Sequence, residues 1–176
     1  SLVWSVCLAY LIHALPSMAA VPGNLVAYGG NEWAQPVNFT FLSWSDIKAV
    51  CPPPTGLCQG TLNGLDVTGF VWASVSDIQA FLIGRFGVPP FYAATEDSVW
   101  APLVFASFTP TDYDDRYDYV EAWSRDESFG VPGKADRVRV HNSYDPTFSD
   151  FANAYSLPIE TGTSVMGAWF YRPPST

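Results

Sequence analysis

The sequence predicts an α+β protein that is rich in β-structure, with a mainly antiparallel sheet or sandwich, one or two short helices and an apolar N-terminal helix before them. Aromatic residues form 16% of the chain and charged residues only 14%, which is typical of a packed β-rich domain. Short β-branched and aromatic runs recur between turn residues, as in strands. Residues 43–49 and 74–86 follow helical spacing instead.

The length of 176 residues suits one domain with two preceding segments. We expect residues 1–20 to form an apolar export segment or membrane anchor, residues 21–36 a linker, and residues 37–176 a single β-rich exported domain. The formal net charge is −9. Since phosphate binding needs a basic surface, we expect no nucleic-acid partner.

The first residues of the chain predict export. Residues 1–31 contain no Asp, Glu, Lys or Arg, and the run from Leu2 to Ala20 is apolar almost throughout. As a helix this run would be about 28 Å long, close to the thickness of a bilayer's hydrocarbon core. Two interpretations stay open: a secretory signal peptide cleaved before Val21, or a retained membrane anchor. Both place the rest of the chain in the periplasm or at the cell surface, in the second case tethered to the inner membrane.

The next elements are short. Strands are expected at Leu25–Tyr28 and Asn38–Leu42, where apolar and β-branched residues gather. The turn residues Asn63 and Gly64 precede a further strand at Asp66–Trp72.

Two helices are expected to begin in the same way. Residues 43–49 and 74–80 both read Ser-x-Ser-Asp-Ile-x-Ala. The first Ser can cap the helix, and the Asp three residues later can complete a capping box and complement the helix dipole. Pro52–Pro54 cut the first helix short, and Gly87 ends the second.

Cys51 and Cys58 flank a loop of Pro and Gly residues, while Cys7 lies in the apolar segment. Because exported proteins enter an oxidising compartment, a disulfide between Cys51 and Cys58 is the leading interpretation. Closing so short a loop would stabilise the fold by about 2 kcal/mol. A zinc site would need more ligands than these two thiols, and no His lies near them in the sequence.

Two segments carry a family resemblance. LNGLDVTGFVWASVSDIQAF, residues 62–81, resembles a segment of exported bacterial proteins of the PEP-CTERM-sorted kind, in which an LNG-D-TG-WAS-V-A pattern recurs. MGAWFYR, residues 166–172, resembles the close of the same domain. The resemblance implies export and a shared fold and says little about chemistry. The family's sorting signal, a Pro-Glu-Pro motif with an apolar helix and a basic tail, does not occur in this sequence.

Most of the remaining elements are expected to be strands. Arg137–His141 alternates strictly, so its basic side chains should point outward. The other expectations are buried or central strands at Leu103–Phe108, Tyr119–Ser124 and Val165–Tyr171, and a short helix at Phe148–Ala154.

Acidic and aromatic residues alternate in one polar region. Carboxylates are the ligands that Ca²⁺ prefers, so a calcium site is one interpretation, although the spacing is not that of an EF-hand. The other interpretation is a solvated loop whose acids pair with Arg137 and Arg139. Aromatic faces beside acidic acceptors are also how proteins hold sugars. The residues concerned are Asp112, Asp114, Asp115 and Asp118 for the metal, and Tyr113, Tyr117 and Tyr119 for a glycan.

Catalysis is not favoured by any motif. The sequence contains no nucleophile elbow, phosphate-binding loop, GxGxxG or HExxH pattern. His141 lies beside Asn142, without a nucleophile in a recognisable setting. The first hypothesis is therefore a non-enzymatic exported protein, a structural or binding module that contacts other envelope proteins and is tethered through residues 2–20 if they are retained. The alternative is a carbohydrate-binding or carbohydrate-active protein that uses the Asp/Tyr region.

Overall fold

The computed structural model describes residues 19–93, 95–96, 98–145 and 148–173 and has a β-rich α+β fold with antiparallel sheets. It contains three short α-helices in these ranges, where the sequence led us to expect one or two. The expected helix within Leu2–Ala20 lies outside the described residues, apart from the last two positions. Within the described ranges, no helix has the length and apolar character needed to span a membrane.

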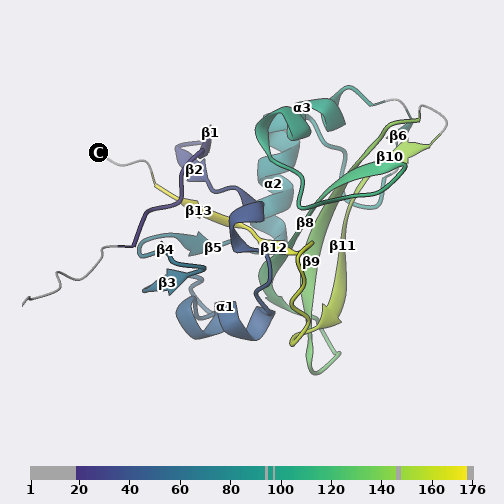
Figure 1. The fold of residues 1–176 in the computed structure, drawn as a ribbon. Coiled ribbons are helices and arrows are strands. Elements are labelled where there is room, and N and C mark those ends of the chain that lie inside the picture. Colours follow the sequence, from purple (N-terminus) through teal and green to yellow (C-terminus); the bar gives the residue numbers. More distant parts are fainter. Residues whose placement is uncertain (1–18, 94, 97, 146–147, 174–176) are drawn as a thin grey trace, which may run out of the picture.

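The largest sheet is built on three long antiparallel strands, which form one wall of the molecule (Figure 1). These are β8 (Tyr117–Glu127), β9 (Lys134–Ser143) and β11 (Ala152–Pro158). Strand β9 lies between the other two. Two short strands also pair with β8: β7 (Asp112–Tyr113) runs antiparallel to it and β12 (Gly167–Ala168) runs parallel.

A second sheet has four short antiparallel strands in the order β1-β2-β13-β5. The strands are β1 (Val26–Tyr28), β2 (Asn31–Trp33), β13 (Phe170–Arg172) and β5 (Val71–Trp72). Strand β13 is central, which agrees with the expectation for Val165–Tyr171, although that segment is divided between two sheets. The C-terminal segment thus joins the two sheets.

Two helices cover one face of the large sheet (Figure 1). Helix α2 (Val75–Phe86) and helix α3 (Trp100–Ser107) pack their apolar side chains against residues of β8, β9 and β11. This first core contains Ile78, Phe81, Leu82, Val104, Val120, Val138, Val140 and Trp169.

A second core lies around helix α1 (Trp44–Val50) and the 3-10 helix η1 (Pro36–Phe39). Its largest side chains are those of Phe39, Trp44, Phe70, Trp72, Trp123 and Phe170. The remaining strands form two small pairs. They are β3 (Thr61–Leu62) with β4 (Leu65–Asp66), and β6 (Thr95–Glu96) with β10 (Ser149–Asp150).

Both expected capping boxes are present. The backbone N–H of Ser43 donates to Asp46 at 2.8 Å, and that of Ser74 donates to Asp77 at 2.9 Å. Each Ser hydroxyl in turn accepts a hydrogen bond from the Asp backbone N–H. Gly87 ends α2 with a left-handed φ of 74°, as its place after the apolar face predicts.

Two expected strands are wholly or partly helical instead. Leu103–Phe108 belongs largely to α3, because a continuous apolar run suits a buried helix as well as a strand. Trp100, Ala101 and Val104 of that helix are buried at helical spacing. Residues 38–42, expected as a strand, overlap η1, where Pro36 at the first turn supplies a helical φ.

One expected helix is made of strands, and one expected strand is interrupted. Phe148–Ala154 is not a helix, since β10 and the start of β11 occupy it. The expected strand Asp66–Trp72 is divided between β4 and β5. Gly69 lies between them with a φ of 84°, which breaks an extended conformation.

Candidate functional site

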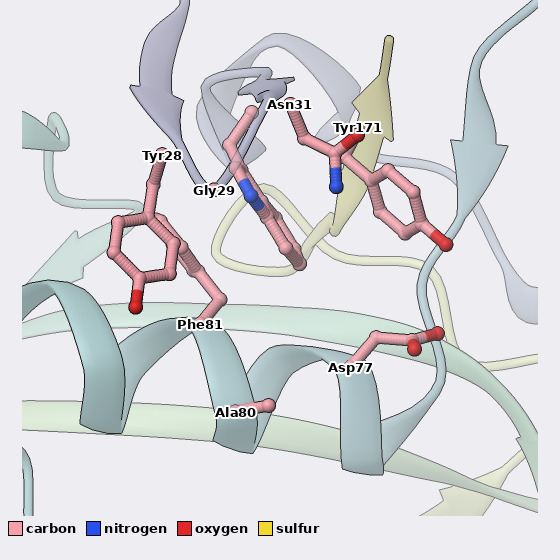
Figure 2. A pocket seen from close by; sticks show the side chains of 8 residues that line it. Tyr28, Gly29, Asn31, Asp77, Ala80, Phe81 and Tyr171 are labelled. Carbon is pink, nitrogen blue, oxygen red and sulfur yellow. The ribbon is translucent and has the colours of Figure 1, made fainter.

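A cleft of about 310 Å³ opens where the β1–β2 hairpin, β13 and α2 meet (Figure 2). Three segments far apart in the sequence therefore contribute to it. Its main lining side chains are Tyr28, Asn31 and Trp33 from the hairpin, Asp77 and Phe81 from α2, and Tyr171 from β13.

Aromatic rings form the floor of this cleft. The Trp33 ring stacks on Phe81 with ring centroids 4.1 Å apart and an angle of 11° between the planes. Tyr171 lies 5.0 Å from Trp33, and Tyr28 lies 5.8 Å from Phe81. Trp33 and Phe81 are buried, while Tyr28 and Tyr171 are half-buried and form the sides.

Gly84 lets Tyr28 lie close against α2. A Cβ atom at this position would stand 1.9 Å from the Tyr28 hydroxyl oxygen. An isolated Gly inside a helical pattern signals such a packing reason, and this was the one cue in the sequence that pointed toward the cleft.

Several polar groups at the cleft have no partner among the described residues. The indole Nε1 of Trp33 is buried without a hydrogen bond, although its residue is only 3% exposed. The Asn31 carboxamide and the hydroxyls of Tyr28 and Tyr171 likewise bond to no side chain or backbone group in the described ranges. Figure 2 shows Asn31 and Tyr171 on one side of the cleft and Tyr28 on the other. Burial, followed by the nearby Asp77 carboxylate, raises the pKa of Tyr171, so its hydroxyl keeps its proton.

Asp77 has a structural role and a free oxygen. Its Oδ2 accepts from the Ser74 backbone N–H at 2.9 Å and from the Ser74 hydroxyl at 2.6 Å. The Arg125 guanidinium lies 3.7 Å from the same oxygen. Oδ1 has no partner in the described part of the chain, and about a third of the side chain, 34%, is exposed. The capping box therefore fixes the carboxylate and leaves one oxygen for a ligand.

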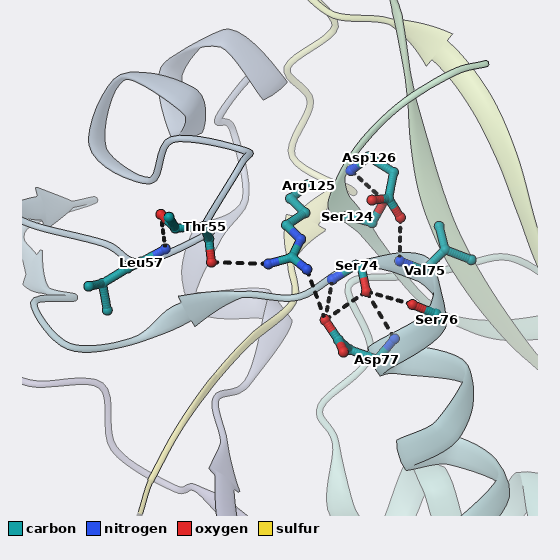
Figure 3. A network of polar contacts seen from close by, with 9 residues as sticks. All are labelled: Thr55, Leu57, Ser74, Val75, Ser76, Asp77, Ser124, Arg125 and Asp126. Carbon is teal, nitrogen blue, oxygen red and sulfur yellow. Dashed lines mark hydrogen bonds and ion pairs between the residues drawn. The ribbon is translucent and has the colours of Figure 1, made fainter.

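Arg125 connects this carboxylate to the disulfide loop (Figure 3). Its Nη1 donates to the carbonyl oxygen of Thr55 at 3.1 Å, and its backbone N–H donates to Ala73 at 2.9 Å. The next residue, Asp126, accepts from the Val75 backbone N–H at 2.6 Å. Strand β8, the start of α2 and the loop are thus held together beside the cleft.

Cys51 and Cys58 form a disulfide in the structure and are fully buried. The loop that they close depends on Gly56, whose φ is 67°. A Cβ atom at Gly56 would lie 2.5 Å from the carbonyl oxygen of Trp72 and 2.9 Å from the Arg125 guanidinium. Backbone conformation and space therefore both require glycine here.

The Asp/Tyr region forms the β7–β8 hairpin, and its polar groups bond to one another. Asp114 accepts hydrogen bonds from the backbone N–H groups of Arg116 and Tyr117, both at 2.8 Å, and from the Tyr119 hydroxyl. Asp118 accepts one from the Tyr144 hydroxyl. The hydrogen bond from Tyr119 is the largest cause of the lowered pKa of Asp114, and that from Tyr144 to Asp118 is the largest cause of the raised pKa of Tyr144, about 12.

The predicted metal and glycan residues have different surroundings in this hairpin. Tyr113 is 76% exposed, whereas Tyr117 and Tyr119 pack against each other and against His141. The structure brings together no group of three or more acidic, His or Cys side chains suited to a metal ion within the ranges it describes. The calcium site at Asp112, Asp114, Asp115 and Asp118 stays a prediction.

Arg137 and Arg139 alternate with the core residues Val138 and Val140, as expected, but their ion pairs in the described structure are not with the hairpin acids. Both pair with the buried carboxylate of Glu121 on the adjacent strand β8. Arg137 is buried and lies over the Tyr155 ring, with its guanidinium 4.0 Å from the ring centroid. Burial lowers the pKa of Arg137 to about 10. Strict alternation predicted that the face of β9 with the arginines is exposed. Whether that face is covered depends on residues of other strands, here Glu121 and Tyr155.

His141 lies among aromatic rings and not beside a nucleophile. Its ring centroid is 3.7 Å from that of Phe151 and 4.8 Å from that of Tyr119, and neither ring nitrogen has a hydrogen-bond partner in the described structure. Burial, followed by the charge of Arg139, lowers the pKa of His141 to about 3. The imidazole is therefore neutral at physiological pH and packs as a core side chain.

Comparison with protein-family models, with curated proteins and with solved structures found no match for this chain.

Proposed function

We propose that this chain is a non-enzymatic exported protein that acts as a binding or structural module at the bacterial envelope. The observation that carries the proposal is the buried Cys51–Cys58 disulfide, because such bonds persist in oxidising compartments. The apolar run Leu2–Ala20 also supports export, either as a cleaved signal or as an anchor. With an anchor, the protein would be an accessory subunit tethered beside other envelope proteins.

A binding role is supported by the way in which polar groups are used. His141 is neutral, contacts aromatic rings and, among the described residues, has no hydroxyl or thiol hydrogen-bonded to its ring nitrogens. Asp77, by contrast, offers one oxygen at the edge of an aromatic cleft. Fixed polar groups in a concave apolar site suit ligand binding.

Cell fractionation with thiol trapping tests the proposal. Residues 1–176, preceded by an initiator Met, would be produced in a bacterial host, and each fraction treated with an alkylating mass tag before and after reduction. We expect protein in the periplasmic or membrane fraction, with Cys51 and Cys58 tagged only after reduction. The double variant Cys51→Ser/Cys58→Ser controls for tagging at Cys7. Accumulation in the cytoplasm with both loop thiols tagged without reduction would contradict export. Mass analysis of the mature N-terminus distinguishes a cleaved signal from a retained anchor.

The second candidate is a carbohydrate-binding or carbohydrate-active protein that uses the β7–β8 hairpin. The exposed ring of Tyr113 favours it, since open aromatic faces can stack on sugars. A glycan array probed with and without Ca²⁺ tests this candidate together with the calcium prediction. Binding that requires both Ca²⁺ and Asp114 would support it, and a signal that is unchanged by chelation and by Asp114→Ala would count against it.

A further inference from the structure

We propose that the cleft between the β1–β2 hairpin, β13 and α2 binds a neutral sugar, a hexose-sized residue of a glycan. The inference deepens the binding part of the proposed function and places the ligand away from the Asp/Tyr hairpin. The volume of about 310 Å³ lies at the lower end of the usual range for small-molecule sites, about 300–1,000 Å³. A cleft of this size suits a saccharide ring better than a nucleotide or a larger cofactor.

The polar groups of the cleft match hydroxyl chemistry. Trp33 Nε1 can only donate a hydrogen bond, and the free Oδ1 of Asp77 can only accept one. The Asn31 carboxamide and the Tyr171 hydroxyl can do both. Each hydroxyl of a sugar also donates and accepts, so one ring can satisfy this mixed set. The Nε1 of Trp33 is buried and has no partner among the described residues, which is a sign of a missing partner because a buried donor left without one destabilises the fold.

The apolar surface of the cleft matches the C–H face of a sugar. Tyr28 and Tyr171 are half-buried, so part of each ring can pack against a ligand. They stand on opposite sides of the cleft, and Asn31 and Asp77 both lie on the side of Tyr171 (Figure 2). A sugar ring packed against the exposed part of the Tyr171 ring would bring its edge hydroxyls to these polar groups.

Two other ligand classes fit less well. An organic cation binds best over the open face of a Trp ring, and Phe81 already covers one face of Trp33, with ring centroids 4.1 Å apart. Arg125 also lies 3.7 Å from the Asp77 carboxylate and offsets its charge. An anion would meet a cleft with no Lys, Arg or His among its lining residues, in a chain of net charge −9.

Titration of the ¹⁵N-labelled chain, followed by nuclear magnetic resonance, tests this inference. The probes are the methyl glycosides of glucose, galactose, mannose and N-acetylglucosamine, with choline chloride as the cationic comparison. We expect at least one glycoside to shift the Trp33 indole N–H resonance in a saturable way, and choline to leave it unchanged. Asn31→Ala and Tyr171→Phe should each weaken that binding by about 3- to 10-fold, the value of one hydrogen bond. Asn38→Ala and Tyr113→Phe are the matched controls outside the cleft and should bind like the original chain.

The other outcomes overturn the inference. They are the absence of a saturable shift with every glycoside, a shift with choline alone, or glycoside binding that both cleft variants retain and Tyr113→Ala loses. Circular dichroism of each variant shows whether it is folded. If Asn31→Ala is unfolded, the binding of the conservative Tyr171→Phe variant tests the inference. None of these results changes the fractionation and thiol pattern, so failure of the sugar site is distinguishable from failure of export.

Discussion

The cleft and the β7–β8 hairpin contain the same kinds of residue but use them differently. In the hairpin, Asp114 and Asp118 accept hydrogen bonds from Tyr119 and Tyr144. In the cleft, the Asn31 carboxamide and the Trp33 indole N–H have no hydrogen-bond partner within the described residues. The hairpin thus uses Asp114 and Asp118 in its own structure, whereas the cleft leaves a set of groups for a ligand. Residue composition alone does not distinguish these two uses, and the hydrogen bonds of the individual side chains do.

The largest difference in stability should come from removing one aromatic ring from the cleft and one from the hairpin region. Phe81→Ala removes the buried floor of the cleft and should destabilise the fold by about 3–5 kcal/mol. Phe148→Ala, near the hairpin, removes a ring that is 37% exposed and packs against Tyr117, so its effect should be much smaller. Chemical denaturation of both variants measures the difference. Equal losses of stability in the two variants would contradict the assignment of Phe81 to the hydrophobic core.

Gly56→Ala tests the contacts between the disulfide loop, Trp72 and Arg125 beside the cleft. The substitution places a Cβ atom against the Trp72 carbonyl at a positive φ, so we expect a loss of about 1–3 kcal/mol. Gly64→Ala is the matched control, since its φ of 75° is similar but nothing lies within 4 Å of its Cβ position. Thermal unfolding of both variants separates the cost of φ from the cost of the contact. If Gly64→Ala costs as much, the contact with Trp72 and Arg125 contributes nothing.

His141, which packs on the hairpin side, should make stability depend on pH. Its folded pKa of about 3 lies below the ordinary value of 6.5 for His, so the unfolded chain binds more protons between these values. The contribution of neutral His141 is therefore complete above about pH 6.5 and decreases as the pH falls toward 3. Urea unfolding across this window should show the decrease, and His141→Phe should flatten it. An imidazole that titrates near pH 6.5 in the folded protein would be inconsistent with its burial.

The smallest effect is expected at the hairpin turn. The hydrogen bond from the Tyr119 hydroxyl is the main cause of the lowered pKa of Asp114, so Tyr119→Phe should return that pKa toward the ordinary value of 3.8. The contribution of the charged Asp114 is present above pH 3.8 and is lost as the pH falls through the lower, folded value. Titration of the carboxyl carbon resonance of Asp114 measures both effects. No change on removing the hydroxyl would mean that Tyr119 does not bond to Asp114 in solution.

Local signals in the sequence were sufficient for some elements and not for the cleft. The capping boxes at Ser43 and Ser74 and the pairing of Cys51 with Cys58 each depend on residues within one turn or loop, so spacing predicted them. Helix α3 was missed because an apolar run carries no period that separates a helix from a strand.

The burial of Arg137 and the cleft itself were missed for a different reason. The strand pattern around Arg137 does not indicate which segments cover its outer face. The cleft combines residues near positions 30, 80 and 171, and only the tertiary fold brings these together. The residues that the sequence singled out for a ligand, Tyr113, Tyr117 and Tyr119, are instead neighbours within one hairpin. The binding of a glycan by these three tyrosines stays a prediction.

Chemical-shift mapping of a glycoside titration over the whole backbone tests most directly whether the unpartnered groups mark the binding site. We expect the shifts to concentrate at residues 28–33, at Asp77 and Phe81 and at Tyr171, with residues 112–119 unchanged. Shifts confined to residues 112–119, with the cleft residues unchanged, would contradict this assignment.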